Sequence, residues 1–277
     1  MNRRFLKEYP RLTIITPSYN QGQFLEETIL SVLDQDYPNL EYIIIDGGST
    51  DNTLQVIKKY ERYLSYWVSE SDRGQSHALN KGLQRASGDL VGWINSDDVY
   101  VRGAFRKVIN AFSRNPDCIL VHGDRILIDS TSNVYGWGMS GKFDPERSGF
   151  NVCSETAFWR RDVRSKSMTF KEYLRFAMDL EFFCRLYSKG EFIKLNSYLG
   201  FFRAHFSSKS TTIWDVAVAE AAREWMLIFG RQHDGWKIVA RPSISGKVKL
   251  ITKFLLNPRL VAYPYLYRRF ILRRRGI

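Results

Sequence analysis

Short apolar runs alternate with helical repeats of apolar residues over the first hundred positions of the chain. Residues 12–16 and 41–46 are rich in β-branched side chains, as buried strands are. Between them, apolar side chains recur at helical spacing over residues 23–35. The alternation continues with a helix ending near residue 60 and capped by Ser49 or Thr50, strands at 66–69 and 90–94, and a helix over 75–86. Repeated strand–helix units predict a mostly parallel sheet flanked by helices, an α/β fold.

The second half of the chain has a less regular pattern. Short strands are predicted at residues 119–124, 126–129 and 134–138, the last two pairing as a hairpin. A helix over 178–189 and a long strand over 192–205 follow. The amphipathic pattern of residues 212–229 predicts a C-terminal helical extension.

Charge separates the chain into two parts. The 277 residues carry a net charge of +12, and the segment from Lys237 onward holds eleven basic residues and no acidic one. That segment therefore carries +11, and the rest of the chain is nearly neutral. Tyr, Phe and Leu are interleaved with the basic residues, which favours an anionic membrane surface as partner. Packing of this tail on the body is the alternative, and we expect no nucleic-acid partner.

Several function classes are excluded by missing patterns. The three cysteines are far apart in the sequence, so neither a disulfide framework nor a zinc-finger spacing is predicted. The chain has no GxxxxGK[ST] phosphate loop and no GxGxxG after its first strand. No run of about 20 apolar residues and no signal-peptide pattern occur. The absence of these two patterns predicts a cytoplasmic protein. The basic, aromatic tail predicts that it is peripheral at the inner membrane face.

Polar side chains follow each of the four predicted strands of the first half. They are Tyr19 and Asn20, then Asp46, then Glu70 and Asp72, then Asp97 and Asp98. Because the carboxyl ends of parallel strands meet at one edge of the sheet, where ligands bind, these residues predict a site there. The paired carboxylates of residues 95–98 (Asn-Ser-Asp-Asp) are hard oxygen ligands of the kind that Mg²⁺ or Mn²⁺ prefers. A helix cap or an Asx turn is the alternative for this pair.

Five segments in order resemble the family 2 glycosyltransferases. They are Thr-Pro-Ser-Tyr-Asn at 16–20, Ile-Asp-Gly-Gly-Ser-Thr-Asp at 45–51, Ala-Leu-Asn-Lys-Gly at 78–82, Ala-Ser-Gly-Asp at 86–89 and Trp-Ile-Asn-Ser-Asp-Asp at 93–98. The likeness continues at residues 155–160, 177–181 and 202–205 and covers roughly residues 12–210. It implies the GT-A fold of nucleotide-diphospho-sugar transferases, with residues 1–125 binding the nucleotide sugar and 126–211 the acceptor. Residues 212–277 are then the C-terminal helix and the basic, aromatic tail.

The resemblance also implies the donor site. Nucleotide contacts are expected from Thr16, Pro17, Tyr19, Asn20, Asp46, Asp72 and Asp97, with Asp46 accepting a base N–H. Asp97, Asp98 and His205 are expected to bind Mn²⁺ or Mg²⁺. Asn95 stands where the family usually has its first Asp, so one of the two aspartates is expected to bind the metal and the other the ribose. A plain loop position is the alternative for His205.

Asp179 matches the family's catalytic base, although Met178 replaces the acidic residue that often precedes it. A carboxylate at a helix start should have a low pKa unless burial raises it. Glu181 is the nearby rival. Glu155 and Trp159 are expected on the acceptor side, since a Trp face suits a sugar ring, unless they belong to the core.

The function that follows is that of a metal-dependent inverting glycosyltransferase in cell-surface polysaccharide synthesis. The donor is expected to be a nucleotide-diphosphate sugar, with UDP as the nucleotide, and the acceptor a glycan or lipid-linked hydroxyl. The alternatives are a non-catalytic nucleotide-sugar-binding protein and a nucleotidyltransferase on a similar fold.

Overall fold

A computed structural model describes residues 9–138, 140–143, 152–161, 168–206 and 208–231. The basic tail predicted to bind a membrane surface lies outside these residues. In the part of the chain that the structure describes, no helix is both long and apolar enough to cross a membrane.

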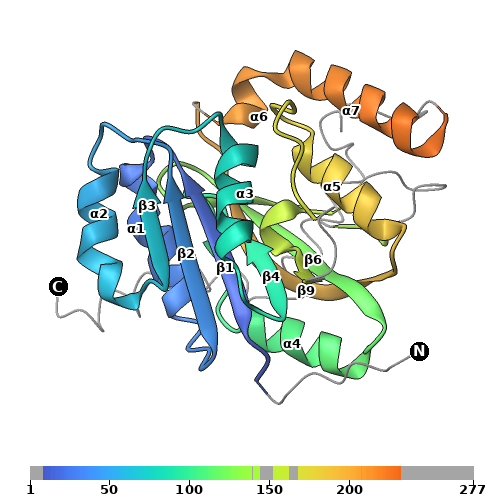
Figure 1. Cartoon of the computed structure of the whole chain (residues 1–277), viewed down its shortest axis with the longest axis horizontal. Coiled ribbons are helices and arrows are strands. Elements are labelled where there is room, and N and C mark those ends of the chain that lie inside the picture. The colour runs from blue at the N-terminus through green and yellow to red at the C-terminus, as the bar shows by residue number, and fades with distance from the viewer. Residues whose placement is uncertain (1–8, 139, 144–151, 162–167, 207, 232–277) are drawn as a thin grey trace.

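The first half has the predicted alternation of strands and helices (Figure 1). Its elements are β1 (Leu12–Ser18), α1 (Gly22–Leu33), β2 (Leu40–Asp46), α2 (Thr53–Tyr60), a 3₁₀ turn (Glu61–Tyr63), β3 (Tyr66–Ser69), α3 (Gln75–Arg85) and β4 (Leu90–Trp93). The predicted cap of α2 is wrong. Asp51 accepts the backbone N–H of Thr53 at 2.9 Å, whereas the Ser49 hydroxyl bonds to Asp46.

The second half differs from prediction in one strand. Its elements are β5 (Val99–Tyr100), α4 (Ala104–Arg114), β6 (Cys118–Ile128), β7 (Val134–Gly138), a 3₁₀ turn (Ser154–Thr156), β8 (Phe158–Arg160), α5 (Met178–Tyr187), β9 (Glu191–Arg203), α6 (Lys209–Thr212) and α7 (Trp214–Phe229). The two strands predicted within residues 119–129 are one strand, β6, whose pairing with β9 shifts register around Asp124. These register shifts coincide with polar residues, which interrupt the apolar pattern without ending the strand. The predicted hairpin is present as the antiparallel pair β6–β7.

One sheet runs through both halves of the described chain. Its strand order is β3-β2-β1-β4-β8-β6-β9-β5, with β7 paired to β6. The pairs from β3 to β4 are parallel, as predicted, whereas β8 pairs antiparallel with β4 and β6. The carboxyl ends of β1, β2, β3 and β4 therefore share one edge.

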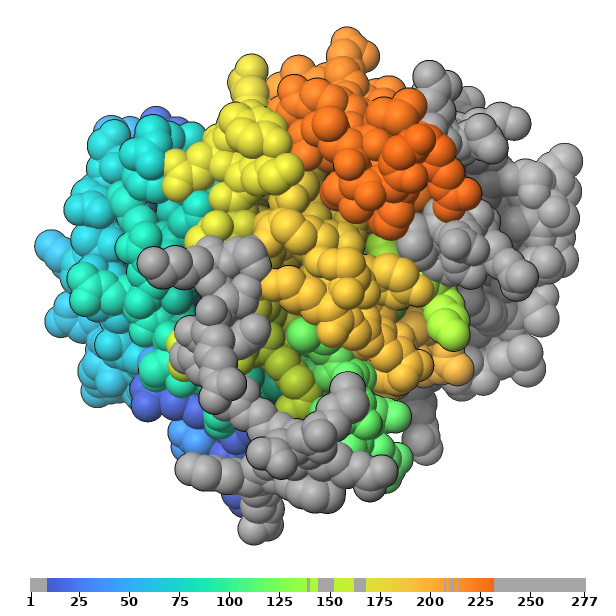
Figure 2. All heavy atoms as spheres, turned by 45° about the vertical axis from the view of Figure 1, so that its right-hand side comes forward, coloured from blue at the N-terminus to red at the C-terminus, as the bar shows by residue number. Residues whose placement is uncertain are grey.

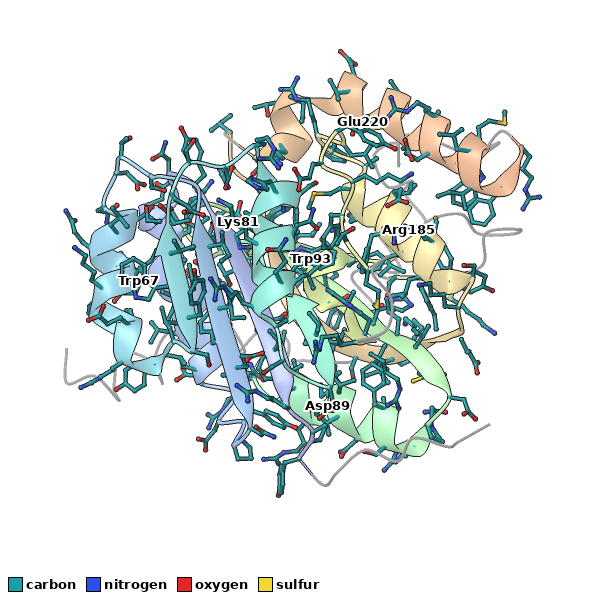
Figure 3. The ribbon with its side chains drawn as sticks, viewed as in Figure 1. Trp67, Lys81, Asp89, Trp93, Arg185 and Glu220 are labelled. Carbon is teal, nitrogen blue, oxygen red and sulfur yellow. The ribbon has the colours of Figure 1, made fainter. Side chains whose placement is uncertain are left out.

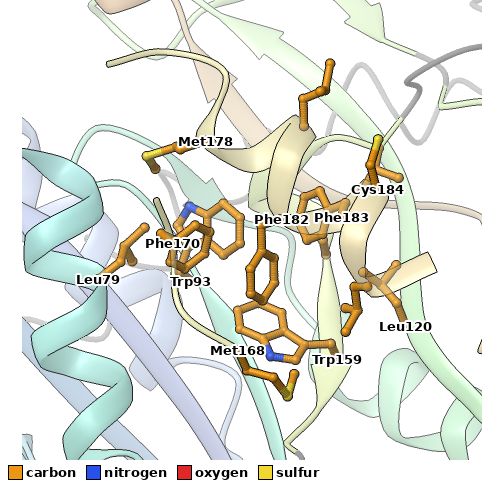
Figure 4. Close-up of a cluster of buried hydrophobic side chains, with 14 of the residues drawn as sticks. Leu79, Trp93, Leu120, Trp159, Met168, Phe170, Met178, Phe182, Phe183 and Cys184 are labelled. Carbon is orange, nitrogen blue, oxygen red and sulfur yellow. The ribbon is translucent and has the colours of Figure 1, made fainter. Parts of the chain in front are cut away.

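Helices cover both faces of the sheet (Figure 1). α1, α2 and α4 pack on one face, which is lined by residues such as Ile14 and Ile44. α3 and α5 pack on the other, around Trp93, and α7 packs on α5. There the rings of Trp93, Phe170 and Phe182 meet, with Trp93 and Phe170 centroids 5.1 Å apart (Figure 4). This aromatic core fixes α5, which carries Asp179, against the end of the parallel sheet.

Candidate active site

Asp46, the last residue of β2, is completely buried. Its carboxylate accepts hydrogen bonds from the backbone N–H of Ser49 at 2.9 Å and of Gly48 at 3.2 Å. The hydroxyls of Ser69, at 2.6 Å, and of Ser49 also bond to it. Asp46 thus joins the ends of β2 and β3. These contacts use both carboxylate oxygens to build the turn that follows the strand.

The residues predicted at the end of β1 divide by exposure. Thr16 and Pro17 are buried, and the Thr16 hydroxyl lies 3.1 Å from the Tyr42 hydroxyl. Tyr19 is 61% exposed. Asn20 has a left-handed backbone (φ 52°) and accepts the Thr50 N–H at 2.9 Å through its side chain. Among these four, Tyr19 and Asn20 are therefore the side chains available to a ligand at this edge.

Asp72 lies against the end of β2. It accepts the N–H of Gly74 at 2.7 Å, in a turn that Gly74 enters with φ 108°. A Cβ atom on Gly47 would be 2.6 Å from the Asp72 carboxylate. The glycine therefore lets the loop after β3 approach the loop after β2 closely.

Asp97 and His205 are 108 positions apart in the sequence and are brought together by the fold. The His205 Nε2 atom lies 2.9 Å from an Asp97 carboxylate oxygen, and the imidazole packs on the Phe24 ring with centroids 4.9 Å apart. A carboxylate and an imidazole are both ligands of Mn²⁺. Within the described residues, no group of three or more His, Cys, Asp and Glu side chains could hold a metal ion. The pair fits a divalent ion only as two of its ligands, and the others would have to come from a bound diphosphate or water.

Asp98 has a different environment from Asp97. It is 1% exposed, and its two oxygens accept the backbone N–H of Arg203 at 2.9 Å and the side-chain amide of Asn95 at 3.2 Å. Burial raises the pKa of Asp98 well above its ordinary value, and the nearby Asp97 and Glu155 raise it further. Of the two aspartates, Asp97 is the one whose geometry favours a metal. Asp98 ties β9 to the end of β4.

Arg203, which was not among the site residues predicted from the motifs, connects the segments around Asp97 and Asp98. Its guanidinium donates to the Asp97 carbonyl at 2.7 Å, to the Asp129 carbonyl at 3.1 Å, to the Ser132 hydroxyl at 2.8 Å and to Glu27 at 2.7 Å. Its carbon lies 4.8 Å from the centre of the Phe24 ring. Its place in the motif at residues 202–205, two residues before His205, was the available sequence signal.

Two further polar residues, Gln75 and Lys209, connect the elements around the site through hydrogen bonds. The Gln75 side chain, at the start of α3, donates to Asn95 at 2.6 Å and accepts from Lys209 at 2.8 Å. Lys209 also approaches the carbonyl of Arg175 at 3.4 Å. This chain of contacts connects the end of β4 with α6 and with the segment before α5.

Asp179 lies in the first turn of α5 and is half-buried. Burial raises its pKa from 3.8 to about 6, although its contact with the backbone N–H of Leu180 at 2.8 Å opposes this. The helix-start argument alone predicts a low pKa, and burial is the larger effect here. A carboxyl group with a pKa near 6 is ionised at neutral pH and is a stronger base than an ordinary aspartate.

The three residues predicted on the acceptor side are buried. Trp159 is 1% exposed and packs on Trp93 and Phe182, so in this structure it belongs to the core and offers no face to a sugar. Glu181 pairs with Arg185 at 2.9 Å and with Lys171 at 3.3 Å, as a structural ion pair. These side chains lie on the faces of β8 and α5 that turn inward, which the sequence pattern did not distinguish.

Glu155 is also buried, but its surroundings are charged. One of its oxygens lies 3.6 Å from the Arg125 guanidinium. Its charge raises the pKa of both Asp98 and Asp179. Asp97, Asp98, Glu155 and Asp179 thus form one electrostatic neighbourhood, which joins the strand-end carboxylates to the start of α5.

Comparison with known proteins identifies the family. Residues 13–190 match the family described as "Glycosyl transferase family 2". The chain belongs to this family. The chain is 32% identical over 127 residues to an uncharacterized glycosyltransferase of Haemophilus influenzae and 39% over 101 residues to a putative teichuronic acid biosynthesis glycosyltransferase, TuaG, of Bacillus subtilis. These matches cover 45% and 35% of this chain, and only 50% and 40% of the two relatives.

Solved structures share the fold at low sequence identity. S. aureus TarS in complex with UDP has a TM-score of 0.62 at 19% identity, covering 89% of this chain and 71% of the other. A mannosyltransferase of Pyrobaculum calidifontis, in complex with GDP-Man and Mn²⁺, has a TM-score of 0.60 at 20% identity, covering 94% and 74%. These likenesses confirm the predicted GT-A type α/β fold.

Proposed function

We propose that this family 2 protein transfers a sugar from a nucleotide-diphosphate donor to an acceptor hydroxyl, with inversion and with a divalent cation. The observation that carries the proposal is the pairing of Asp97 with His205, 2.9 Å apart, at the sheet edge where the ends of β1 to β4 meet. Asp179, whose pKa burial raises to about 6, shares the electrostatic neighbourhood of these carboxylates. A general base for the acceptor hydroxyl and positive charge beside the departing diphosphate both lower the barrier to a single displacement.

In the proposed reaction, the Asp179 carboxylate takes the proton of the acceptor hydroxyl. The oxygen attacks the anomeric carbon of the donor sugar, and the bond from that carbon to the diphosphate oxygen breaks. The nucleoside diphosphate leaves with the electron pair, so one displacement inverts the configuration. A divalent ion held by Asp97 and His205 would supply positive charge to the departing diphosphate. Tyr19, Asn20 and Asp72, at the same edge of the sheet, are proposed to contact the nucleotide.

The donor is proposed to carry UDP. The TarS structures contain UDP and UDP-GlcNAc, which supports this choice, whereas the mannosyltransferase contains GDP-Man and therefore makes GDP the alternative. The name of TuaG supports a role in polysaccharide synthesis. A glycan or lipid-linked acceptor and a membrane-bound tail remain predictions from sequence.

The other two function classes have less support. A nucleotidyltransferase would need a basic loop for a triphosphate, and the loop after β1 contains no Lys or Arg between residues 19 and 23. A non-catalytic binder would not require a base, whereas Asp179 is present with a raised pKa.

Calorimetric titration of UDP and GDP, with and without Mn²⁺, tests the donor site. We expect one nucleotide to bind at least tenfold more tightly with Mn²⁺, and we expect Asp97→Asn to abolish that gain. Asp179→Asn should bind the same nucleotide normally but release no nucleoside diphosphate from the matching sugar donor, with or without a panel of monosaccharide acceptors. Turnover by Asp179→Asn would show that Asp179 is not the base. Nucleotide affinity that is the same with and without Mn²⁺ would show that Asp97 and His205 do not bind a metal ion needed for donor binding.

A further inference from the structure

The C-terminal helix α7 is joined to the body by its packing on α5. Ala221 and Trp225 of α7 belong to the same buried cluster as Phe182 and Phe183 of α5. Figures 1 and 2 both show α7 beside α5 and the segment before it. The family match ends at residue 190, so this helix lies beyond the matched segment.

Glu220, on the buried side of α7, binds the backbone of the turn that leads into α5 (Figure 3). Its carboxylate accepts three consecutive N–H groups, from Arg175 at 2.9 Å, Phe176 at 2.8 Å and Ala177 at 3.0 Å. Glu220 is 8% exposed. Burial alone would raise its pKa, yet these three hydrogen bonds hold the pKa below its ordinary value. The carboxylate is therefore ionised and fully engaged at neutral pH.

The bound turn ends two residues before Asp179. Ala177 is the N-cap of α5 and makes no side-chain capping bond. The carbonyl of Ala177 accepts the first helical hydrogen bond, from the N–H of Glu181 at 3.0 Å. Glu220 thus places a negative charge at the N-terminus of α5 from another helix, and it accepts the N–H of the N-cap residue as the N3 side chain does in a capping box. Fixing residues 175–177 fixes the start of α5 and the direction in which Asp179 leaves it.

We propose that Glu220 is a positioning residue for Asp179, acting through the backbone of residues 175–177. The inference rests on the proposed role of Asp179 as the base. It assigns to α7, a helix outside the family match, a part in the reaction. A proton transfer requires hydrogen-bond distance between base and hydroxyl, so a small displacement of Asp179 lowers the rate without affecting the donor site.

Glu220→Gln removes one acceptor oxygen while keeping the side chain's size. Glu224→Gln is the matched control because Glu224 lies one turn further along α7, is fully buried, and bonds to Lys171 and Tyr173 instead of the backbone of residues 175–177. Two measurements are made on both variants. One is the rate of nucleoside diphosphate release from the sugar donor selected by titration, as kcat and KM. The other is hydrogen–deuterium exchange of the amides of residues 175–181.

For Glu220→Gln we expect kcat to fall at least tenfold, with the donor KM within twofold of the wild-type value, and exchange at residues 175–177 to rise at least tenfold. For Glu224→Gln we expect neither change. Equal behaviour of the two variants in both measurements would overturn the proposal. If Glu220→Gln does not fold, Glu220→Asp, which keeps the charge but withdraws it by one methylene, is measured with the same expectations.

The parallel Asp179→Asn variant separates this proposal from the proposed function. Turnover by Asp179→Asn would show that Asp179 is not the base. The exchange data would then still report whether Glu220 holds the turn. Normal exchange and normal kcat in Glu220→Gln, beside an inactive Asp179→Asn, would reject the role of Glu220 alone.

Discussion

Replacing Asp179 by Asn should remove turnover and at the same time make the folded protein more stable at neutral pH. Burial raises the pKa of Asp179 from 3.8 to about 6, which means that the fold disfavours the ionised carboxylate. Asparagine has the same shape, is neutral, and keeps an oxygen that can accept the Leu180 N–H now bound at 2.8 Å. The substitution therefore removes a buried charge without removing its structural contact.

The expected gain follows from the pKa. At about 1.4 kcal/mol per pKa unit, a rise from 3.8 to about 6 corresponds to at most about 3 kcal/mol of unfolding free energy. An acid whose pKa is higher in the folded state binds its proton more tightly there. Wild-type stability attributable to this group therefore falls as pH rises from about 4 to about 6. The advantage of Asp179→Asn should be complete above about pH 7, about half as large at pH 5, and absent below about pH 4.

Urea unfolding followed by tryptophan fluorescence, at pH 7.5 and pH 5.0, measures the effect. Asp215→Asn is the control, because Asp215 also lies in the first helical turn of its helix but is exposed, and we expect no such gain from it. Equal stability of Asp179→Asn and wild type at pH 7.5 would refute the reasoning. A gain of the same size at both pH values would also refute it, since it could not come from the titration of Asp179.

Two further predictions concern the site. In wild type, kcat should rise with pH through about 6 and level off above it, because Asp179 acts as a base only when ionised; a pH–rate profile without this step would contradict the role. Arg203→Lys cannot reproduce the four guanidinium contacts around Asp97, so the Mn²⁺ concentration for half-maximal activity should rise at least tenfold. Arg160→Lys, which also loses a guanidinium bonded to carbonyls and stacked on a Phe, should leave that concentration unchanged; the same rise in both variants would count against Arg203.

The sequence was sufficient for the parallel part of the fold and for the edge of the sheet where the candidate site lies. β2, for example, has an apolar run from Tyr42 to Ile45 and ends in Asp46, so pattern alone locates both the strand and its polar end. Buried side chains elsewhere were harder to predict. Trp159 fits either a sugar platform or a core position by residue type, and it is the packing of α5 on β8 that buries it.

What the sequence by itself determined was which residue types are available, in which order, at the strand ends. Only the tertiary structure decided which of them meet. Asp97 and His205 are 108 positions apart and lie side by side because β9 pairs with β5, which follows the end of β4. The neighbours Asp97 and Asp98 have different environments, because Asp97 contacts His205 whereas the buried Asp98 bonds to Arg203 and Asn95. Glu220 reaches the turn before Asp179 only through the packing of α7 on α5. Such contacts depend on how elements pack in three dimensions, and local periodicity carries no information about that.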